Sequence, residues 1–353
     1  MQATPELEIA RNLPRAGCSV EEARRYTRWL ATHHYENFNV VSWLLPRRLH
    51  QHFYNVYAYC RWADDLGDEV SDPQKALKLL DEWERELRRC FAGGAGSDHP
   101  VFIALRETII SKHMRMVPFL DLLRAFRMDQ KIHRYETWED VLGYCKYSAN
   151  PVGRLVLYLC DYPDEARQSL SDFICTALQL ANFWQDVDRD LEKGRIYIPL
   201  DILRANGLTV DDVVARRFDE RFVKVMKELI VRTRALFAQG APLARQVSGG
   251  LRVDIELFTK GGLAVLDGIE AVGYDTLHHR PAIGRATQIR LLGGALLERC
   301  MSWLWPGPAD SNGGPSSHGT PTQNKPQQNR TSQDSPSRNK SSRARVEIAG
   351  RHA

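Results

Sequence analysis

Apolar residues recur at positions three and four apart along nearly all of the chain between about residues 19 and 305. This spacing follows the 3.6-residue period of an amphipathic α-helix. The two-residue alternation typical of strands is almost absent, and no strand pattern alternates with the helical segments. The sequence therefore predicts an all-α fold, with residues 19–305 forming one domain after a loose lead-in at residues 1–18.

Capping and breaking residues divide this domain into helices. A capping box at Ser19 and Glu22 and a proline at position 46 mark two of the starts. The expected helices cover residues 19–34, a segment opening at 46, 73–91, 100–116, 118–134, a segment opening at 137, 163–192, 210–239, 243–274 and 285–305. Turns or loops are expected at 35–45 and 194–209.

The composition changes abruptly at Pro306. The formal net charge of the chain is +4, and residues 306–353 alone carry seven Lys or Arg against three Asp or Glu, so the remaining chain is neutral. A segment rich in Gly, Ser, Pro, Asn and Gln cannot bury enough apolar surface to fold, which predicts a disordered basic tail. The neutral body does not indicate nucleic-acid binding, and the tail leaves open a weak contact with anionic lipid.

Cysteine spacing and apolar runs bear on the compartment. The seven cysteines are scattered and include no C-x-x-C pair, which argues against zinc and thioredoxin-type sites. The N-terminus lacks the basic and apolar regions of a signal peptide, and no run of about 18 apolar residues could span a membrane. We therefore expect a reduced cytoplasmic protein without a transmembrane helix, and leave open peripheral contact at the inner face of the membrane.

The most informative stretch lies in the expected helix 163–192. At about 100° per residue, Gln179, Asn182, Asp186 and Asp190 share one stripe of that helix. Two carboxylates four residues apart repel each other by roughly 0.2–0.5 kcal/mol unless a cation lies between them. Asp188 falls on the opposite face, where we expect it to be solvated.

A second acidic stripe lies on an upstream helix. Tyr57, Arg61, Asp64 and Asp68 share one face, with Asp65 at its edge. Two helices with D-x-x-x-D spacing predict two half-sites for a hard metal ion that face each other across a cavity. Oxygen ligands of this kind suit Mg²⁺, which keeps several waters and is usually shared with substrate phosphates.

Such a site supports the ionisation of a diphosphate ester. Metal ions and Arg61 would stabilise the charge that builds on the diphosphate as its C–O bond breaks. The carbocation left behind requires controlled water and nearby aromatic faces. Aromatic residues at or near the stripes are Tyr57, Tyr144, Phe183 and Tyr197. Arg195 is either a phosphate partner or a surface arginine.

The two stripes resemble the signatures of a known family. Q-x-x-N-x-x-x-D-x-x-x-D followed by G-R-I-Y-I-P resembles the second signature of the squalene/phytoene synthase family, and Y-x-x-x-R-x-x-D-D-x-x-D resembles the first. The resemblance covers about residues 20–300. It implies an isoprenoid synthase fold, with helices around a central cavity, that binds a prenyl diphosphate with two or three Mg²⁺ ions. The implied metal ligands are Asp64, Asp68, Asn182, Asp186 and Asp190. The implied substrate-site residues are Tyr57, Arg61, Gln179, Tyr197 and His34.

Three segments depart from the general family pattern. Glu36 and Asn37 stand in a piece where many members have Ser-Lys-Ser/Thr-Phe. Residues 148–153 read S-A-N-P-V-G in place of V-A-G-x-V-G, and Trp184-Gln185 replaces a pattern with arginine before the aspartate. These departures resemble the hydroxysqualene synthase branch, which implies conversion of presqualene diphosphate and water to hydroxysqualene and diphosphate without NADPH.

The branch resemblance suggests further roles. Asn37 is expected to contact substrate, and Asn150 is hypothesised to place the water that captures the carbocation. Losing a lysine and an arginine and gaining Glu36 is compatible with binding one diphosphate instead of two. Other squalene or hopanoid pathway enzymes are conceivable protein partners.

Three alternatives are left open. The first is a head-to-head prenyl transferase of the same family, such as a presqualene diphosphate, squalene or phytoene synthase acting on two prenyl diphosphates. A reducing squalene synthase would also need NADPH. The second is a non-catalytic scaffold protein, which would be expected to lose its aspartates. The third is a lipid-surface binding protein that uses residues 306–353.

Overall fold

The computed structural model describes residues 13–14, 16–33, 45–93 and 97–281. Every named element in these ranges is a helix, and one isolated parallel bridge pairs Arg134 with Ile196. The prediction of an all-α fold is therefore confirmed. No helix among the described residues is long and apolar enough to cross a membrane. The chain divides into the units Met1–Trp305 and Pro306–Ala353. The tail and the expected helix 285–305 lie outside the described residues.

The first half of the chain forms helices close to those expected. Their bounds are α1 Val20–His33, α3 Arg47–Asp68, α4 Pro73–Ala92, α5 Pro100–Ser111, α6 Val117–Asp129, α7 Trp138–Ser148 and α8 Asn150–Leu159. The capping box at Ser19 is present, because the Glu22 carboxylate accepts from the Ser19 backbone N–H at 2.8 Å. Helix α5 ends about one turn earlier than predicted, as does α6. Helix α8 was not predicted; Pro151 lies in its first turn.

The second half contains more breaks than its apolar periodicity suggests. The helices are α9 Glu165–Gln185, α10 Val187–Glu192, α11 Leu200–Ala205, α12 Val210–Val214, α13 Glu220–Gly240, α14 Leu243–Gln246 and α15 Gly249–Ala271. The predicted helix 163–192 is interrupted at Asp186, with φ −103° and ψ 20°. The predicted helix 210–239 is interrupted by Arg216, whose φ is 51°. Extended backbone at Val247 divides the segment 243–274. A short helix, α11, occupies the expected loop 194–209.

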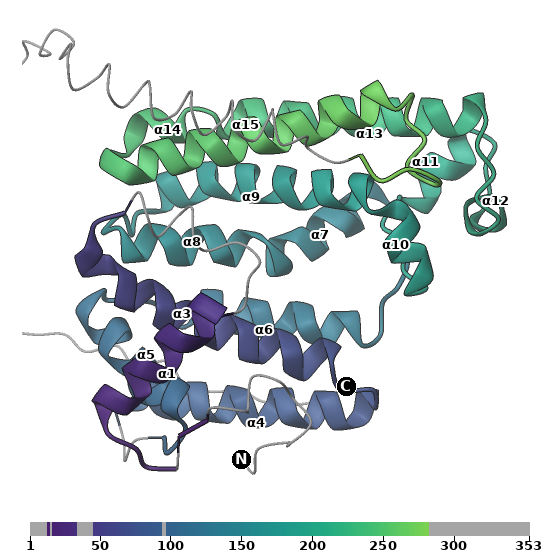
Figure 1. The fold of residues 1–353 in the computed structure, drawn as a ribbon. Helices are drawn as coiled ribbons and strands as arrows, with labels where there is room; N and C mark the ends of the chain where they lie inside the picture. Colours follow the sequence, from purple (N-terminus) through teal and green to yellow (C-terminus); the bar gives the residue numbers. More distant parts are fainter. Residues whose placement is uncertain (1–12, 15, 34–44, 94–96, 282–353) are drawn as a thin grey trace, which may run out of the picture. The chain divides into compact units, whose positions relative to one another are not determined.

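Helix α9 lies at the centre of the helical packing. It contacts α13 and α15 on one side and α7 and α8 on another (Figure 1). Helix α3 packs against α1, α4, α5 and α6, and α6 continues the contacts to α7 and α8. The two acidic helices therefore belong to different groups of helices that meet through α6, α7 and α8.

Each acidic helix is anchored in its own hydrophobic cluster. On α3, Trp62 stacks on Trp83 at a centroid distance of 5.6 Å, and both are almost fully buried. On α9, Trp184 is fully buried and donates a hydrogen bond to the Thr233 hydroxyl at 2.9 Å. Buried aromatic side chains of this size contribute much of the packing energy of a core. They fix which face of each helix remains available for the cavity.

Candidate active site

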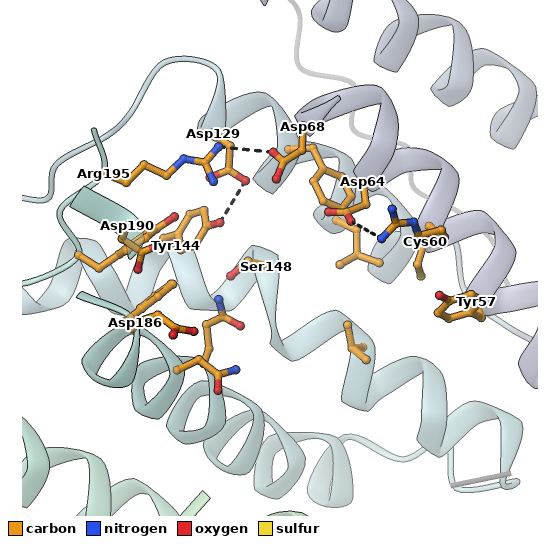
Figure 2. A pocket seen from close by; sticks show the side chains of 18 residues that line it. Tyr57, Cys60, Asp64, Asp68, Asp129, Tyr144, Ser148, Asp186, Asp190 and Arg195 are labelled. Carbon is orange, nitrogen blue, oxygen red and sulfur yellow. Dashed lines mark hydrogen bonds and ion pairs between the residues drawn. The ribbon is translucent and has the colours of Figure 1, made fainter. Parts of the chain in front are cut away.

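A cavity of about 490 Å³ lies between these helices. Figure 2 shows the side chains of its walls, with Asp64 and Asp68 on one side and Asp186 and Asp190 on another. The lining residues are Tyr57, Cys60, Arg61, Asp64, Asp68, Leu122, Phe126, Asp129, Tyr144, Ser148, Val152, Gln179, Asn182, Phe183, Asp186, Asp190, Arg195 and Tyr197. The structure thus brings the two predicted acidic stripes into one cavity.

The first wall is formed by α3. Tyr57, Arg61, Asp64 and Asp68 line the cavity, in agreement with their predicted shared face. Asp65 points away from it and is 1% exposed. Its carboxylate forms an ion pair with the Arg61 guanidinium at 2.6 Å, on the side of Arg61 that faces away from the cavity. Asp65 therefore supports the arginine of the site without lining it.

The second wall is formed by α9 and the start of α10. Gln179, Asn182, Asp186 and Asp190 all line the cavity, although the helix is interrupted at Asp186. The stripe survives the interruption because the Asp190 backbone N–H still donates to the Asp186 carbonyl at 2.9 Å. The i,i+4 relationship is thus retained across the junction of the two helices.

Arg280 contacts a residue of the cavity wall, and the sequence did not reveal this contact. It follows α15 and forms an ion pair with the Asp186 carboxylate. The same segment is held by the Gln185 side-chain amide, which donates to the Pro281 carbonyl at 2.5 Å. Arg280 lies almost one hundred residues after the second stripe, and no spacing rule connects the two. Neither Trp184 nor Gln185 lines the cavity.

Asp129 is a second residue that the sequence did not reveal. It ends α6, is 8% exposed, and accepts a hydrogen bond from the Tyr144 hydroxyl at 3.1 Å. Burial raises the pKa of Asp129 to about 6. Arg195 also lines this part of the cavity and contacts Asp68 at 3.4 Å, so the predicted phosphate partner is placed within the site. Asp129 has no second carboxylate three or four residues away in α6, so the sequence shows no acidic stripe there.

Aromatic rings form one side of the cavity. Phe183 and Tyr197 are stacked, with centroids 3.7 Å apart and an interplanar angle of 4°. Tyr144 lies 5.8 Å from Tyr197 and 6.0 Å from Phe183. Ring faces attract a cation through their quadrupole, most strongly where water is excluded. Three of the four predicted aromatic residues thus gather at one place, and Tyr57 lines the opposite wall.

Several sequence-predicted residues are not brought into the cavity lining. Asn150 begins α8, and its side-chain oxygen accepts a hydrogen bond from the Thr176 hydroxyl at 2.8 Å. It does not line the cavity, so the structure gives no support for its proposed contact with a capturing water. His34 and Asn37 lie outside the described residues. Asp188 faces away from the cavity as expected, and pairs with Arg216 at 2.6 Å.

The oxygen ligands of the two walls fit Mg²⁺. Among the described residues, no three His, Cys, Asp or Glu side chains converge into a ready-made metal site. Mg²⁺ is usually held by only one or two carboxylates, with waters and substrate phosphates completing its coordination. Burial and a neighbouring carboxylate raise the pKa of Asp64 to about 6 and that of Asp190 to about 7. A divalent cation would relieve this unfavourable placement of negative charge.

The charge of the cavity limits what it can bind. Asp64, Asp68, Asp129, Asp186 and Asp190 outnumber the arginines at its walls, so a bare diphosphate would be repelled. Divalent cations would reverse that repulsion and leave the aromatic side free for an apolar chain. The arrangement is suited to an ester that joins a polyanionic head to a hydrocarbon.

Comparisons with known proteins agree with this chemistry. The profile of the squalene/phytoene synthase family matches residues 31–287. Over 229 residues the chain is 37% identical to a hydroxysqualene synthase of Rhodopseudomonas palustris, covering 64% of this chain and 76% of that protein. Over 280 residues it is 30% identical to a 15-cis-phytoene synthase of Synechococcus elongatus, covering 75% and 90%.

A solved structure gives the same indication. The fold is similar to that of a squalene synthase, HpnC, from Alicyclobacillus acidocaldarius, with a TM-score of 0.69 and 46% sequence identity. The likeness covers 72% of this chain and 95% of that one. It confirms the predicted isoprenoid synthase type of fold.

Proposed function

The chain belongs to the squalene/phytoene synthase family, and we propose that it is a Mg²⁺-dependent hydroxysqualene synthase. The reaction is the conversion of presqualene diphosphate and water to hydroxysqualene and diphosphate, without NADPH. The observation that carries the proposal is the placement of both acidic stripes on facing walls of one cavity with an aromatic side. Relatives named hydroxysqualene synthase support this branch of the family.

The acidic walls would bind and orient the diphosphate through Mg²⁺. Asp64 and Asp68 would hold Mg²⁺ on one wall, and Asn182, Asp186 and Asp190 on the other. When bound, Mg²⁺ supplies positive charge to the departing diphosphate. Gln179 can donate its amide N–H groups to phosphate oxygens from the same stripe.

Two arginines assist from the chain itself. Arg61 is held by buried Asp65 at 2.6 Å, so its guanidinium is fixed at the cavity wall before substrate binds. Arg195 also lines the cavity and contacts Asp68 at 3.4 Å. Preorganised cations of this kind stabilise charge that develops on a leaving group without having to reorganise.

The aromatic side stabilises the hydrocarbon cation. Tyr144, Phe183 and Tyr197 line the cavity as one group of rings beside Asp190. They favour a delocalised positive charge and keep bulk water away from it. A single water must still reach the cation for an alcohol to form.

The second candidate is a head-to-head prenyl transferase acting on two prenyl diphosphates. It is favoured by the match to the phytoene synthase, which covers more of this chain than the match to the Rhodopseudomonas palustris protein. The two candidates share the first ionisation step and differ in how many diphosphates the cavity handles.

Product analysis separates the two candidates. The purified protein is incubated with Mg²⁺ and either presqualene diphosphate or farnesyl diphosphate, without NADPH, and the products are identified by mass spectrometry. We expect hydroxysqualene from presqualene diphosphate. Presqualene diphosphate or phytoene formed from shorter substrates would instead support the transferase. Asp190→Asn serves as the inactive variant, and Glu192→Gln, an exposed carboxylate on α10, is its matched control.

A further inference from the structure

Ser148 is a polar residue of the cavity to which the metal-diphosphate site gives no role. It ends α7, one helical turn after Tyr144, and lines the cavity. Its hydroxyl oxygen is buried and has no hydrogen-bond partner.

Asp129 presents a second unpartnered polar atom to the same region. Its side chain is 8% exposed and lines the cavity. The Tyr144 hydroxyl donates to Oδ2 at 3.1 Å, whereas Oδ1 is buried and accepts no hydrogen bond. Tyr144 therefore fixes one carboxylate oxygen and leaves the other free. Figure 2 shows Tyr144 next to Asp129 and Ser148 further toward the middle of the cavity, with Asp190 and Arg195 on the same side as Asp129.

Buried polar atoms without protein partners are commonly satisfied by ordered water. The cavity has room for water at about 490 Å³. Tyr144, which donates to Asp129, adjoins Phe183 and Tyr197, and Arg195 and Asp68 are charged groups that act on Asp129. A water held here would lie against the side of the cavity that suits a carbocation, and away from the bulk solvent.

We propose that Ser148 and Asp129 hold the water molecule that captures the carbocation. This inference rests on the proposed function and names the residues that decide its product. The diphosphate leaves with the electron pair of its C–O bond. The water oxygen then forms a new C–O bond to the cation, its O–H bond breaks, and the proton passes to Oδ1 of Asp129. Ser148 orients the water, and Tyr144 positions the carboxylate.

Within residues 148–150, the proposal gives control of the product to the hydroxyl of Ser148 instead of the amide of Asn150. Asn150 is directed to Thr176 by its hydrogen bond, while Ser148 faces the cavity. Helix α7 ends at Ser148 and α8 begins at Asn150, so the two side chains belong to different helices. Removing the Ser148 hydroxyl should therefore change the fate of the cation without preventing ionisation.

The test compares Ser148→Val with wild type on presqualene diphosphate and Mg²⁺. Loss of a hydrogen bond to the water is expected to lower the alcohol share of the products about tenfold, in favour of hydrocarbon products of proton loss. Diphosphate release should stay within about threefold of wild type, because ionisation does not use Ser148. Ser148→Thr, which keeps the hydroxyl, should retain the alcohol. Ser169→Val, an exposed serine on α9, is the matched control.

Asp129→Asn tests the proton acceptor separately. An amide cannot take the proton, so the alcohol share should fall as it does in Ser148→Val. An unchanged alcohol share in both variants, with diphosphate still released, would overturn the inference and leave the proposed function intact. Wild-type protein that makes no hydroxysqualene would contradict the proposed function instead.

A structural readout does not depend on turnover. A high-resolution crystal structure of the wild type with Mg²⁺ and a farnesyl thiodiphosphate should show an ordered water bonded to the Ser148 hydroxyl and the Asp129 carboxylate. Ser148→Val should lack it. Absence of that water from the wild type would count against the inference even if the alcohol is the product.

Discussion

Two adjacent glycines of α15 should respond in opposite ways to the same substitution. A Cβ at Gly262 would clash with the Phe237 ring and lie 2.8 Å from a Leu178 methyl carbon. A Cβ at Gly261 meets no described atom within 4 Å. Phe237 is 2% exposed and cannot move aside freely. We therefore predict that Gly262→Ala destabilises the protein and that Gly261→Ala stabilises it.

The expected magnitudes follow from packing and helix propensity. Alanine is favoured over glycine within a helix by roughly 0.5–1 kcal/mol, and this gain applies to both positions. Overpacking a core site by one methyl group costs about 1–3 kcal/mol, and this applies to Gly262 alone. Because the propensity gain cancels in the comparison, the two variants should differ by about 1–3 kcal/mol in the free energy of unfolding.

Urea unfolding of both variants and the wild type measures this difference. The m-values should agree, so that shifts in midpoint report stability. Gly262→Ala should also reduce turnover, since Leu178 precedes Gln179 of the second acidic wall, and a displacement of about 1 Å can cost up to about 100-fold. If Gly262→Ala is as stable as Gly261→Ala, the inference that α15 packs too closely against α9 and α13 at Gly262 to admit a methyl group is refuted.

Three further predictions concern the site and its support. Mg²⁺ and inorganic diphosphate should raise the melting temperature of the wild type, by a stabilisation of about 2.7 kcal/mol at a ligand concentration of 100 times Kd. Asp190→Asn should abolish this rise, and an undiminished rise would exclude Asp190 as a metal ligand. Tyr197→Phe should keep most activity. Tyr197→Leu should lose about 5- to 30-fold in turnover, since the ring face carries about 1–2 kcal/mol of cation stabilisation; equal turnover of the two variants would refute the role of the ring. Burial lowers the pKa of His99 to about 3, so the unfolded chain binds more protons between about pH 6.5 and 3, and stability falls on acidification through that window. His99→Asn, which can still cap α5, should lose up to about 3 kcal/mol less free energy of unfolding between pH 7 and pH 4 than the wild type, as measured by urea unfolding. An identical loss in both proteins would contradict the assignment to His99.

The acidic stripes could be predicted because they depend only on local helical rotation. Asp64 and Asp68 belong to one helix, and the hydrogen bond between Asp190 and Asp186 preserves the same spacing on the other. Their meeting across one cavity was inferred from the chemistry that two carboxylate pairs require. In the structure, tertiary packing through α6, α7 and α8 brings the two stripes together.

The remaining site residues depend on contacts between segments distant in sequence. Asp129 comes from α6, where no neighbouring carboxylate marks it, and Arg280 reaches Asp186 from beyond α15. Asn150 was singled out because residues 148–153 depart from the family pattern, and nothing in the sequence indicated that its side-chain oxygen accepts a hydrogen bond from Thr176. Arg216 adopts the left-handed conformation between α12 and α13, and because it is not a glycine no sequence signal indicated that the helix would break there.

Oxygen labelling tests the proposed ionisation most directly. The wild-type protein is allowed to convert presqualene diphosphate in H₂¹⁸O with Mg²⁺, and the alcohol and the diphosphate are analysed separately by mass spectrometry. Cleavage of the C–O bond followed by capture of the cation by water predicts one ¹⁸O atom in the hydroxysqualene and none in the diphosphate. Label in the diphosphate, with release of presqualene alcohol, would contradict ionisation at carbon.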